Sequence, residues 1–236
     1  MSDTSRHRAG DSAELSGALS EGPLVTEGPG LLVMDVDSTL IEQEVIELIA
    51  ERAGTRELVA EVTARAMRGE LDFAASLRER VATLAGVPQG VFAEVLAEVR
   101  PTQGAAELVE TLHARGCRVG VVSGGFEEVV VPLAERLGID HVAANRLEVV
   151  EGRLTGRVLG RIVDRQEKVR CLRTWAQQDG VPMERTIAVG DGANDLGMLE
   201  AAGLGVAFCA KPVVVEQADA AIHVRDLRAV LQLIGG

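Results

Sequence analysis

Two carboxylates, Asp35 and Asp37, stand directly after an apolar run and are the first residues whose type and spacing suggest chemistry. The run Leu31–Met34 has the uninterrupted apolar character of a strand buried on both faces of a parallel sheet. Buried carboxylates are costly unless they are paired or bind a metal. Because open α/β sheets bind ligands beyond the carboxyl ends of their strands, this pair predicts a functional site there.

The spacing of these two acids favours phosphoryl chemistry. Asp35, at the strand end, could attack phosphorus and form an aspartyl-phosphate. Asp37 could curl back over the same site, protonate the leaving oxygen and then activate water. Two anions facing an anionic phosphate require a divalent cation, and oxygen-only ligands suit Mg²⁺. An ordinary acidic turn, in which Asp caps the following helix, is the alternative explanation.

A second acidic segment, Gly190–Asp195, also follows an apolar strand. Its glycines permit a tight turn, and Asp191 stands at the strand end, where it could complete the metal site. Asn194 and Asp195 could hold the loop or reach the substrate. A glycine-rich strand-to-helix turn with an Asn or Asp cap would have the same composition.

A hydroxyl and a base complete the set of candidate groups. Ser123, with Gly124 and Gly125, follows another apolar strand, and its hydroxyl and the neighbouring N–H groups would form a phosphate seat. A Ser cap beside flexible glycines is the alternative. Lys168 lies near the start of a predicted helix, where a lone Lys is usually a surface charge. Each group alone is ordinary, but their occurrence together at the ends of successive elements favours one shared site.

Strands and helices alternate through most of the chain. From residue 103 onward the pattern predicts an α/β protein with a three-layer, Rossmann-like parallel sheet core. Four consecutive helical patterns interrupt this order, so residues 41–100 are predicted to form an inserted four-helix cap. The core then comprises residues 30–40 and 101–236. Residues 1–29 are rich in Ser, Gly and Glu without sustained periodicity, and we expect a flexible N-terminal tail.

The composition argues against several classes of partner. With a formal net charge of −12, 2% aromatic residues and no basic stripe, the chain is not expected to bind nucleic acid or an anionic membrane. No apolar run reaches membrane-spanning length, and the N-terminus lacks a signal-peptide pattern. Cys117, Cys171 and Cys209 are scattered in apolar surroundings, which is typical of reduced thiols in a cytoplasmic protein. Both a monomer and a homodimer fit the sequence.

One set of residues resembles a known family: Asp35-x-Asp37-x-Thr39, Ser123, Lys168 and Gly190-Asp191-x-x-x-Asp195. The family is the haloacid dehalogenase superfamily of Mg²⁺-dependent phosphotransferases. The resemblance implies that Asp35 is the nucleophile and a Mg²⁺ ligand. It implies that Asp37 is the general acid and base and binds Mg²⁺ through its backbone carbonyl, and that Asp191 is the third protein ligand.

The same resemblance implies how a phosphoryl group would be held. Ser123, the Gly124 N–H and Lys168 would bind its oxygens. Asn194 would contact the substrate on its phosphate side. Asp195 would support either the metal shell or Lys168.

More narrowly, the chain is similar to the phosphoserine phosphatases of this superfamily, through stretches that include Ala66-Met67, Ser76-Leu77-Arg78-Glu79-Arg80-Val81 and Ala207-Phe208-Cys209-Ala210-Lys211-Pro212. That similarity implies that Glu44 pairs with the ammonium group of the substrate and Arg80 with its carboxylate, while Met67 and Phe73 line an apolar lid. An Arg suits the carboxylate because it binds such a group bidentately. Arg78 is a near competitor, and both Glu44 and Arg80 could instead be solvated helix residues.

The expected activity is Mg²⁺-dependent hydrolysis of O-phospho-L-serine to L-serine and phosphate through an aspartyl-phosphate. Two alternatives remain open at this point. A related enzyme could act on another small phosphomonoester or transfer the phosphoryl group to an acceptor such as homoserine. A catalytically silent binding protein could also use this fold, although it would have no reason to keep three acids in a buried site.

Overall fold

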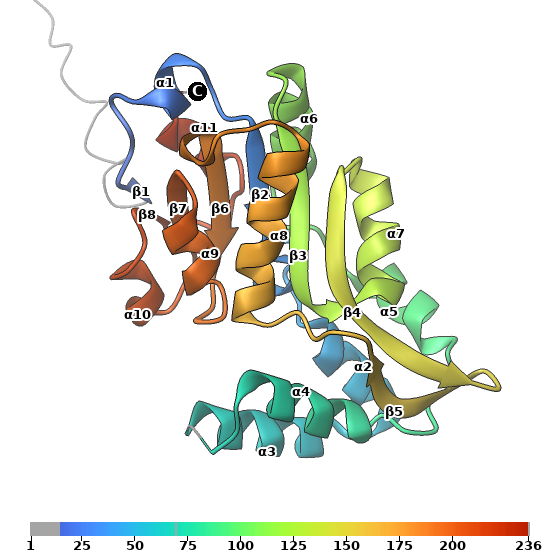
Figure 1. Ribbon diagram of the computed structural model, residues 1–236. Coiled ribbons are helices and arrows are strands. Elements are labelled where there is room, and N and C mark those ends of the chain that lie inside the picture. The colour runs from blue at the N-terminus through green and yellow to red at the C-terminus, as the bar shows by residue number, and fades with distance from the viewer. Residues whose placement is uncertain (1–14, 69, 236) are drawn as a thin grey trace, which may run out of the picture.

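The computed structural model describes residues 15–68 and 70–235 of the chain. Within these residues, eight strands form one sheet in the order β1-β8-β7-β6-β2-β3-β4-β5 (Figure 1). Strands β8, β7, β6, β2, β3 and β4 are parallel, while β1 and β5 pair antiparallel at the two edges. The strands are β1 (Leu15–Ser16), β2 (Leu31–Met34), β3 (Arg118–Phe126), β4 (His141–Val150), β5 (Arg153–Leu159), β6 (Thr186–Gly190), β7 (Leu204–Phe208) and β8 (Ala220–Ile222).

The helices pack around this sheet and beyond one end of it. They are α1 (Pro23–Thr26), α2 (Val45–Ala53), α3 (Arg56–Met67), α4 (Phe73–Ala82), α5 (Val91–Glu98), α6 (Ala105–Ala114), α7 (Glu127–Leu137), α8 (Arg165–Gln178), α9 (Leu196–Ala201), α10 (Pro212–Val215) and α11 (Ala229–Leu233). Across residues 15–68 and 70–235, none of them has both the length and the apolar character that crossing a bilayer requires.

The sheet separates two hydrophobic cores, because successive side chains of a strand point to opposite faces. In β2, Leu31 and Val33 belong to the core under α8 and α9, whereas Leu32 and Met34 belong to the core under α6 and α7. All four side chains are fully buried, which explains the uninterrupted apolar run. The predicted three-layer α/β fold is therefore confirmed.

The carboxyl ends of the central strands lie together along one edge of the sheet, at right angles to its outer strands. Met34 of β2 lies opposite Val121 of β3 and Val189 of β6. Because the strands are parallel, the residues that follow these three positions leave the sheet side by side. This register places the polar segment after each strand at a common edge.

Helices α2, α3 and α4 lie beyond that edge (Figure 1). The chain leaves the core and returns to it through two adjacent segments, which meet in an antiparallel bridge between Ile41 and Pro101. The Thr102 N–H also donates to the Leu40 carbonyl at 2.8 Å. This pairing supports placing the limits of the helical cap at residues 41 and 100.

The expected flexible tail differs from the structure where residues 15–29 are described. Leu15 pairs with Ile222 at the edge of the sheet, and Leu24 in α1 is buried. The edge of β8 offers unpaired backbone groups, and a two-residue strand is enough to occupy them. So short a pairing leaves no periodic pattern in the sequence. The remainder of the predicted tail, residues 1–14, lies outside the described residues.

A long hairpin, β4 and β5, connects the core with the cap. Strand β4 is continuous over ten residues, and β5 packs against α4. The Leu154 N–H donates to the Val87 carbonyl, and the Gly86 N–H donates to the Leu154 carbonyl. Gly156 of β5 has a φ of +82°, and a Cβ there would lie 3.1 Å from the Ala85 Cβ and 3.2 Å from the Ala82 backbone. A glycine is therefore required where the hairpin meets the cap.

We predict that Gly156→Ala lowers the free energy of unfolding by about 2–4 kcal/mol, because it combines left-handed backbone strain with overpacking. Gly160→Ala is the matched control, since Gly160 has a φ of +72° but no atom within 4 Å of the added Cβ. That control should lose only about 1–2 kcal/mol. Urea unfolding measures both values, and equal losses in the two variants would contradict the tight contact between hairpin and cap.

Candidate active site

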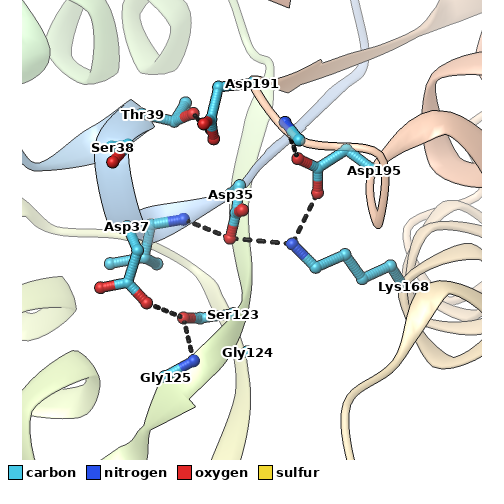
Figure 2. Close-up of polar contacts among 12 residues, drawn as sticks. Asp35, Asp37, Ser38, Thr39, Ser123, Gly124, Gly125, Lys168, Asp191 and Asp195 are labelled. Carbon is cyan, nitrogen blue, oxygen red and sulfur yellow. Dashed lines mark hydrogen bonds and ion pairs between the residues drawn. The ribbon is translucent and has the colours of Figure 1, made fainter. Parts of the chain in front are cut away.

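Asp35 lies immediately after β2 and is almost fully buried. Its Oδ1 atom accepts a hydrogen bond from the Val36 N–H at 2.7 Å and an ion pair from Lys168 Nζ at 2.8 Å (Figure 2). Burial and the nearby Asp195 raise the pKa of Asp35 well above its ordinary value, while Lys168 opposes that shift. The carboxylate is thus held in a fixed orientation at the centre of the site, and neither contact involves its Oδ2 atom.

Lys168 is the base that the sequence left open as a surface charge, and the structure places it in the interior. Asp164 caps α8 by accepting from the Glu167 N–H, and Lys168 follows one turn later with its side chain fully buried. Its Nζ atom lies 2.6 Å from Asp195 Oδ1 as well as 2.8 Å from Asp35. Burial alone would lower the pKa of Lys168, but the two carboxylates outweigh it and raise the pKa. Lys168 therefore stays protonated between two acids.

Asp37 lies in the tight turn Val36–Leu40 that follows β2. Its Oδ1 accepts from the Val45 N–H at 2.9 Å, and the Ser123 hydroxyl lies 3.5 Å from its Oδ2. Burial, followed by the charge of Glu44, raises the pKa of Asp37 to about 7. A carboxyl group with such a pKa can both donate and accept a proton near neutral pH.

Asp191 brings a third acid to Asp35 and Asp195. One carboxylate oxygen from each of these three residues lies within 4.8 Å of the others. The Thr39 hydroxyl donates to Asp191 at 3.2 Å, while burial and Asp195 raise the pKa of Asp191 to about 6. Such a concentration of carboxylate oxygens fits a hard divalent cation, which would relieve their mutual repulsion.

This cluster of side-chain carboxylates shares Asp35 and Asp191 with the ligand set expected by resemblance. It contains Asp195, whereas the expected set has the backbone carbonyl of Asp37. Asp195 is already engaged, because its Oδ1 pairs with Lys168 and its Oδ2 accepts from the Gly192 N–H at 3.0 Å (Figure 2). These contacts favour a role for Asp195 in holding Lys168 and the loop of Asp191.

Ser123 and Gly124 leave the sheet where β3 bulges away from β4. The Ser123 side chain is buried, and its Oγ atom accepts from the Gly125 N–H at 2.8 Å. A Cβ added to Gly124 would lie 2.9 Å from the Phe73 ring, so this glycine packs directly beneath a side chain of the cap. The bulge therefore brings a hydroxyl group and a backbone segment to the same edge as Asp35 and Asp37.

A cavity of about 670 Å³ joins this edge to the cap. Its core side includes Asp35, Asp37, Gly124, Asp191 and Asn194. Its cap side includes Glu44, Phe73 and Arg80. These eight candidate residues from both parts of the chain thus face one space, whereas Ser123, Lys168 and Asp195 lie behind its lining.

The cap residues differ in how they face this cavity. Arg80 lines it and is half-buried, whereas Arg78 is exposed and does not belong to the lining. The Ser38 hydroxyl donates to Glu44 at 2.8 Å, and burial raises the pKa of Glu44. These positions favour Arg80 over Arg78 as the cation of the cavity. The side chain of Met67 lies outside the described part of the chain.

Sequence reasoning gave no role to several residues that line or support the cavity. Thr39 belongs to the recognised motif, but only the structure shows its bond to Asp191. Arg165 and Lys211 bring positive charge to the lining. A cation in the first turn of a helix is unfavourable to the helix dipole, so Arg165 carried a sequence signal. Lys211 lies within a stretch similar to the phosphoserine phosphatases, but that similarity gave it no role.

Comparisons with known proteins agree with this geometry. The family model for haloacid dehalogenase-like hydrolases matches residues 32–200. The chain is 54% identical over 210 residues to a phosphoserine phosphatase of Streptococcus thermophilus, covering 89% of this chain and 98% of that protein. It is 61% identical over 205 residues to a phosphoserine phosphatase of Streptomyces coelicolor, covering 87% of this chain but only 50% of that longer protein.

The fold gives the same result. A solved structure of a phospho-aspartyl intermediate analogue of phosphoserine phosphatase superposes with a TM-score of 0.82 at 45% identity, covering 87% of this chain and 99% of the other. A substrate-bound phosphoserine phosphatase complex also superposes with a TM-score of 0.82, at 44% identity and with 87% and 98% coverage. With its family match, its relatives and its arrangement of acids in agreement, the chain belongs to the haloacid dehalogenase-like hydrolases.

Proposed function

We propose that this protein is a phosphoserine phosphatase, which hydrolyses O-phospho-L-serine to L-serine and phosphate with Mg²⁺. The observation that carries the proposal is one cavity with two different sides. The acids assigned to phosphoryl transfer line one side, and Glu44 and Arg80 line the other. A phosphorylated zwitterionic amino acid requires all three elements: a phosphate seat, an anion for the ammonium group and a cation for the carboxylate. The names of the similar proteins support the same substrate.

The reaction proceeds in two displacements. Asp35 attacks phosphorus in line with the serine oxygen, and Asp37 donates its proton to that oxygen as the bond to phosphorus breaks. Serine then departs and leaves an aspartyl-phosphate on Asp35. Asp37, now deprotonated, takes a proton from water as the water oxygen attacks phosphorus. Phosphate is released, and both carboxyl groups return to their starting states.

The remaining core residues bind charge and fix orientation. Ser123, the Gly124 N–H and Lys168 hold the phosphoryl oxygens, while Asn194 contacts the substrate on the same side. Asp195 holds the Lys168 ammonium group through the 2.6 Å ion pair. Because these groups are positioned before the substrate binds, they can stabilise the transition state without reorganising.

Mg²⁺ would be held by Asp35, the backbone carbonyl of Asp37 and Asp191. When bound, it supplies positive charge that offsets the repulsion between the carboxylates and the phosphoryl group. The donors are all oxygens, which matches the preference of this cation. The three free cysteines are consistent with a cytoplasmic enzyme.

Substrate selection falls to the cap. Glu44 pairs with the ammonium group and Arg80 with the carboxylate, and Phe73, which lines the cavity above Gly124, covers the apolar part of the substrate. Closure of the cap excludes water during the first displacement, and opening releases serine.

The proposal is tested by measuring phosphate release from phosphoserine and from other small phosphomonoesters, with and without Mg²⁺. We expect a preference for phosphoserine, a requirement for Mg²⁺ and loss of activity in Asp35→Asn of at least about 10³-fold, because the nucleophile is removed. Homoserine added to the reaction should yield no phosphohomoserine. Equal use of unrelated phosphomonoesters would refute the substrate, and transfer to homoserine would favour the phosphotransferase alternative.

Stability should fall with rising pH in the absence of Mg²⁺ and fall less steeply in its presence. The pKa values of Asp37 (about 7) and Asp191 (about 6) exceed the ordinary Asp value of about 4. Between about pH 4 and these raised values, the folded chain therefore binds more protons than the unfolded chain. With a chelator present, the contribution of these two groups to the free energy of unfolding is therefore greatest below about pH 4. It falls as the pH rises toward 7. Mg²⁺ should stabilise the protein more at pH 8 than at pH 5, because protons compete for the same carboxylates at the lower pH. At a hundredfold excess over its Kd, the whole stabilisation by Mg²⁺ is about 3 kcal/mol.

Urea unfolding at pH 5 and pH 8 measures both effects without any substrate. Asp37→Asn should flatten the pH dependence of the metal-free protein, because one buried titrating group is lost. Equal stabilisation by Mg²⁺ at both pH values would contradict the assignment of the cation to these carboxylates.

Arg80→Lys should raise KM for phosphoserine by roughly tenfold or more, because Lys cannot form the bidentate pair with the carboxylate. Phosphoethanolamine, which lacks that carboxylate, provides a substrate whose kcat/KM should not change. Arg78→Lys is the matched control, since Arg78 is exposed and lies outside the cavity lining. A larger effect of Arg78→Lys than of Arg80→Lys would reverse the assignment.

A further inference from the structure

The phosphate seat depends on a break in the pairing between β3 and β4. Val122 lies opposite Ala143, and the next pair is Phe126 with Asn145. Strand β3 thus advances four residues while β4 advances two. Ser123, Gly124 and Gly125 thus stand against the single residue Ala144, leave the ladder and turn toward Asp37, as expected of a β-bulge at a functional site.

Such a bulge removes backbone groups from the ladder, and buried backbone groups need other partners. Asn145 supplies one of them. Its Nδ2 donates to the Gly124 carbonyl at 2.8 Å, although Asn145 belongs to the neighbouring strand and is fully buried. The side chain therefore replaces a missing ladder bond at Gly124, the residue whose N–H is assigned to the phosphoryl oxygens.

The other end of the same amide reaches a second segment of the site. Asn145 Oδ1 accepts from the Val163 N–H at 2.9 Å. Val163 is buried and precedes Asp164, the residue that caps α8, and Lys168 follows one turn later. One buried side chain thus joins the bulge of Gly124 to the start of the helix that carries Lys168.

A fully buried amide is costly unless both of its ends are bonded, so its position is strongly constrained. Here both ends bond to backbone, and each backbone segment carries one of the groups assigned to the phosphoryl oxygens. We propose that Asn145 is a positioning residue: it sets the separation between the Gly124 N–H and the Lys168 ammonium group, and thereby the affinity of the seat for phosphate. The inference rests on the proposed function only in taking this seat to bind a phosphoryl group.

The test measures the Kd of inorganic phosphate by calorimetry in the presence of Mg²⁺, together with the thermal midpoint of each variant. Asn145→Ala removes both hydrogen bonds, and Asn145→Asp keeps the volume and one acceptor but lacks the amide donor to the Gly124 carbonyl. We expect the Kd to rise roughly tenfold or more in both variants, since a factor of ten corresponds to the loss of about one hydrogen bond. The KM for phosphoserine should rise in parallel.

Thr186→Val is the matched control for a merely structural role. Thr186 is also fully buried, and its hydroxyl also joins two backbone groups, donating to the Met183 carbonyl and accepting from the Gly203 N–H. It lies at the start of β6, at the end of the strand opposite to the site. This variant should lower the thermal midpoint and leave the Kd for phosphate unchanged.

The proposal is overturned if the Asn145 variants lose thermal stability as Thr186→Val does but bind phosphate like the parent protein. Should Asn145→Ala fail to fold, the volume-conserving Asn145→Asp decides the question. The outcome is separable from the substrate proposal. A parent protein that binds phosphate but does not hydrolyse phosphoserine refutes only the substrate, whereas normal phosphate binding by the variants of an active enzyme refutes only the role of Asn145.

Discussion

A buried ammonium group held between two carboxylates is the interaction on which the rest of the site depends. Lys168 Nζ lies 2.8 Å from Asp35 and 2.6 Å from Asp195, and none of the three side chains has appreciable exposure. Removing one partner from such an arrangement leaves an uncompensated buried charge, which is strongly destabilising. The three residues come from the end of β2, the first turns of α8 and the loop after β6. The sheet must therefore place β2 beside β6, and α8 must cover the face between them, before the charges can balance.

This arrangement divides the work between the two parts of the chain. The core fixes most of the charge. Asp35, Asp195, Lys168 and the bulge of β3 are held by hydrogen bonds and ion pairs within the core, and the Val45 N–H of the cap adds one hydrogen bond to Asp37. The cap contributes Glu44, Phe73 and Arg80 to the same cavity and is tied to the core by the β4–β5 hairpin. Under the proposed function, phosphoryl transfer depends on the sheet, whereas the choice of substrate depends on the helices that cover it.

The pattern of apolar and polar residues was sufficient to predict most helices and strands and the edge of the sheet at which the site lies. The apolar run Leu31–Met34 predicted a buried strand, and all four side chains do pack into cores. The acids that follow it indicated a site, because carboxylates next to a buried strand are costly without a partner. The same pattern could not predict contacts between distant segments. Lys168 has the appearance of a surface residue until α8 is placed against Asp195, and the pairing of Leu15 with Ile222 depends on an edge that exists only in the folded sheet. Asn145 is another such case, because its two partners lie 21 and 18 residues away.

The central claim is that Asp35 itself accepts the phosphoryl group. Rapid quenching of the enzyme with phosphoserine and Mg²⁺, followed by mass spectrometry of the peptides, tests it most directly. The account predicts one phosphoryl group on the peptide that contains Asp35, formed and consumed at least as fast as serine is released. Steady release of phosphate with no phosphorylation of Asp35, or with phosphorylation at another residue, would contradict it.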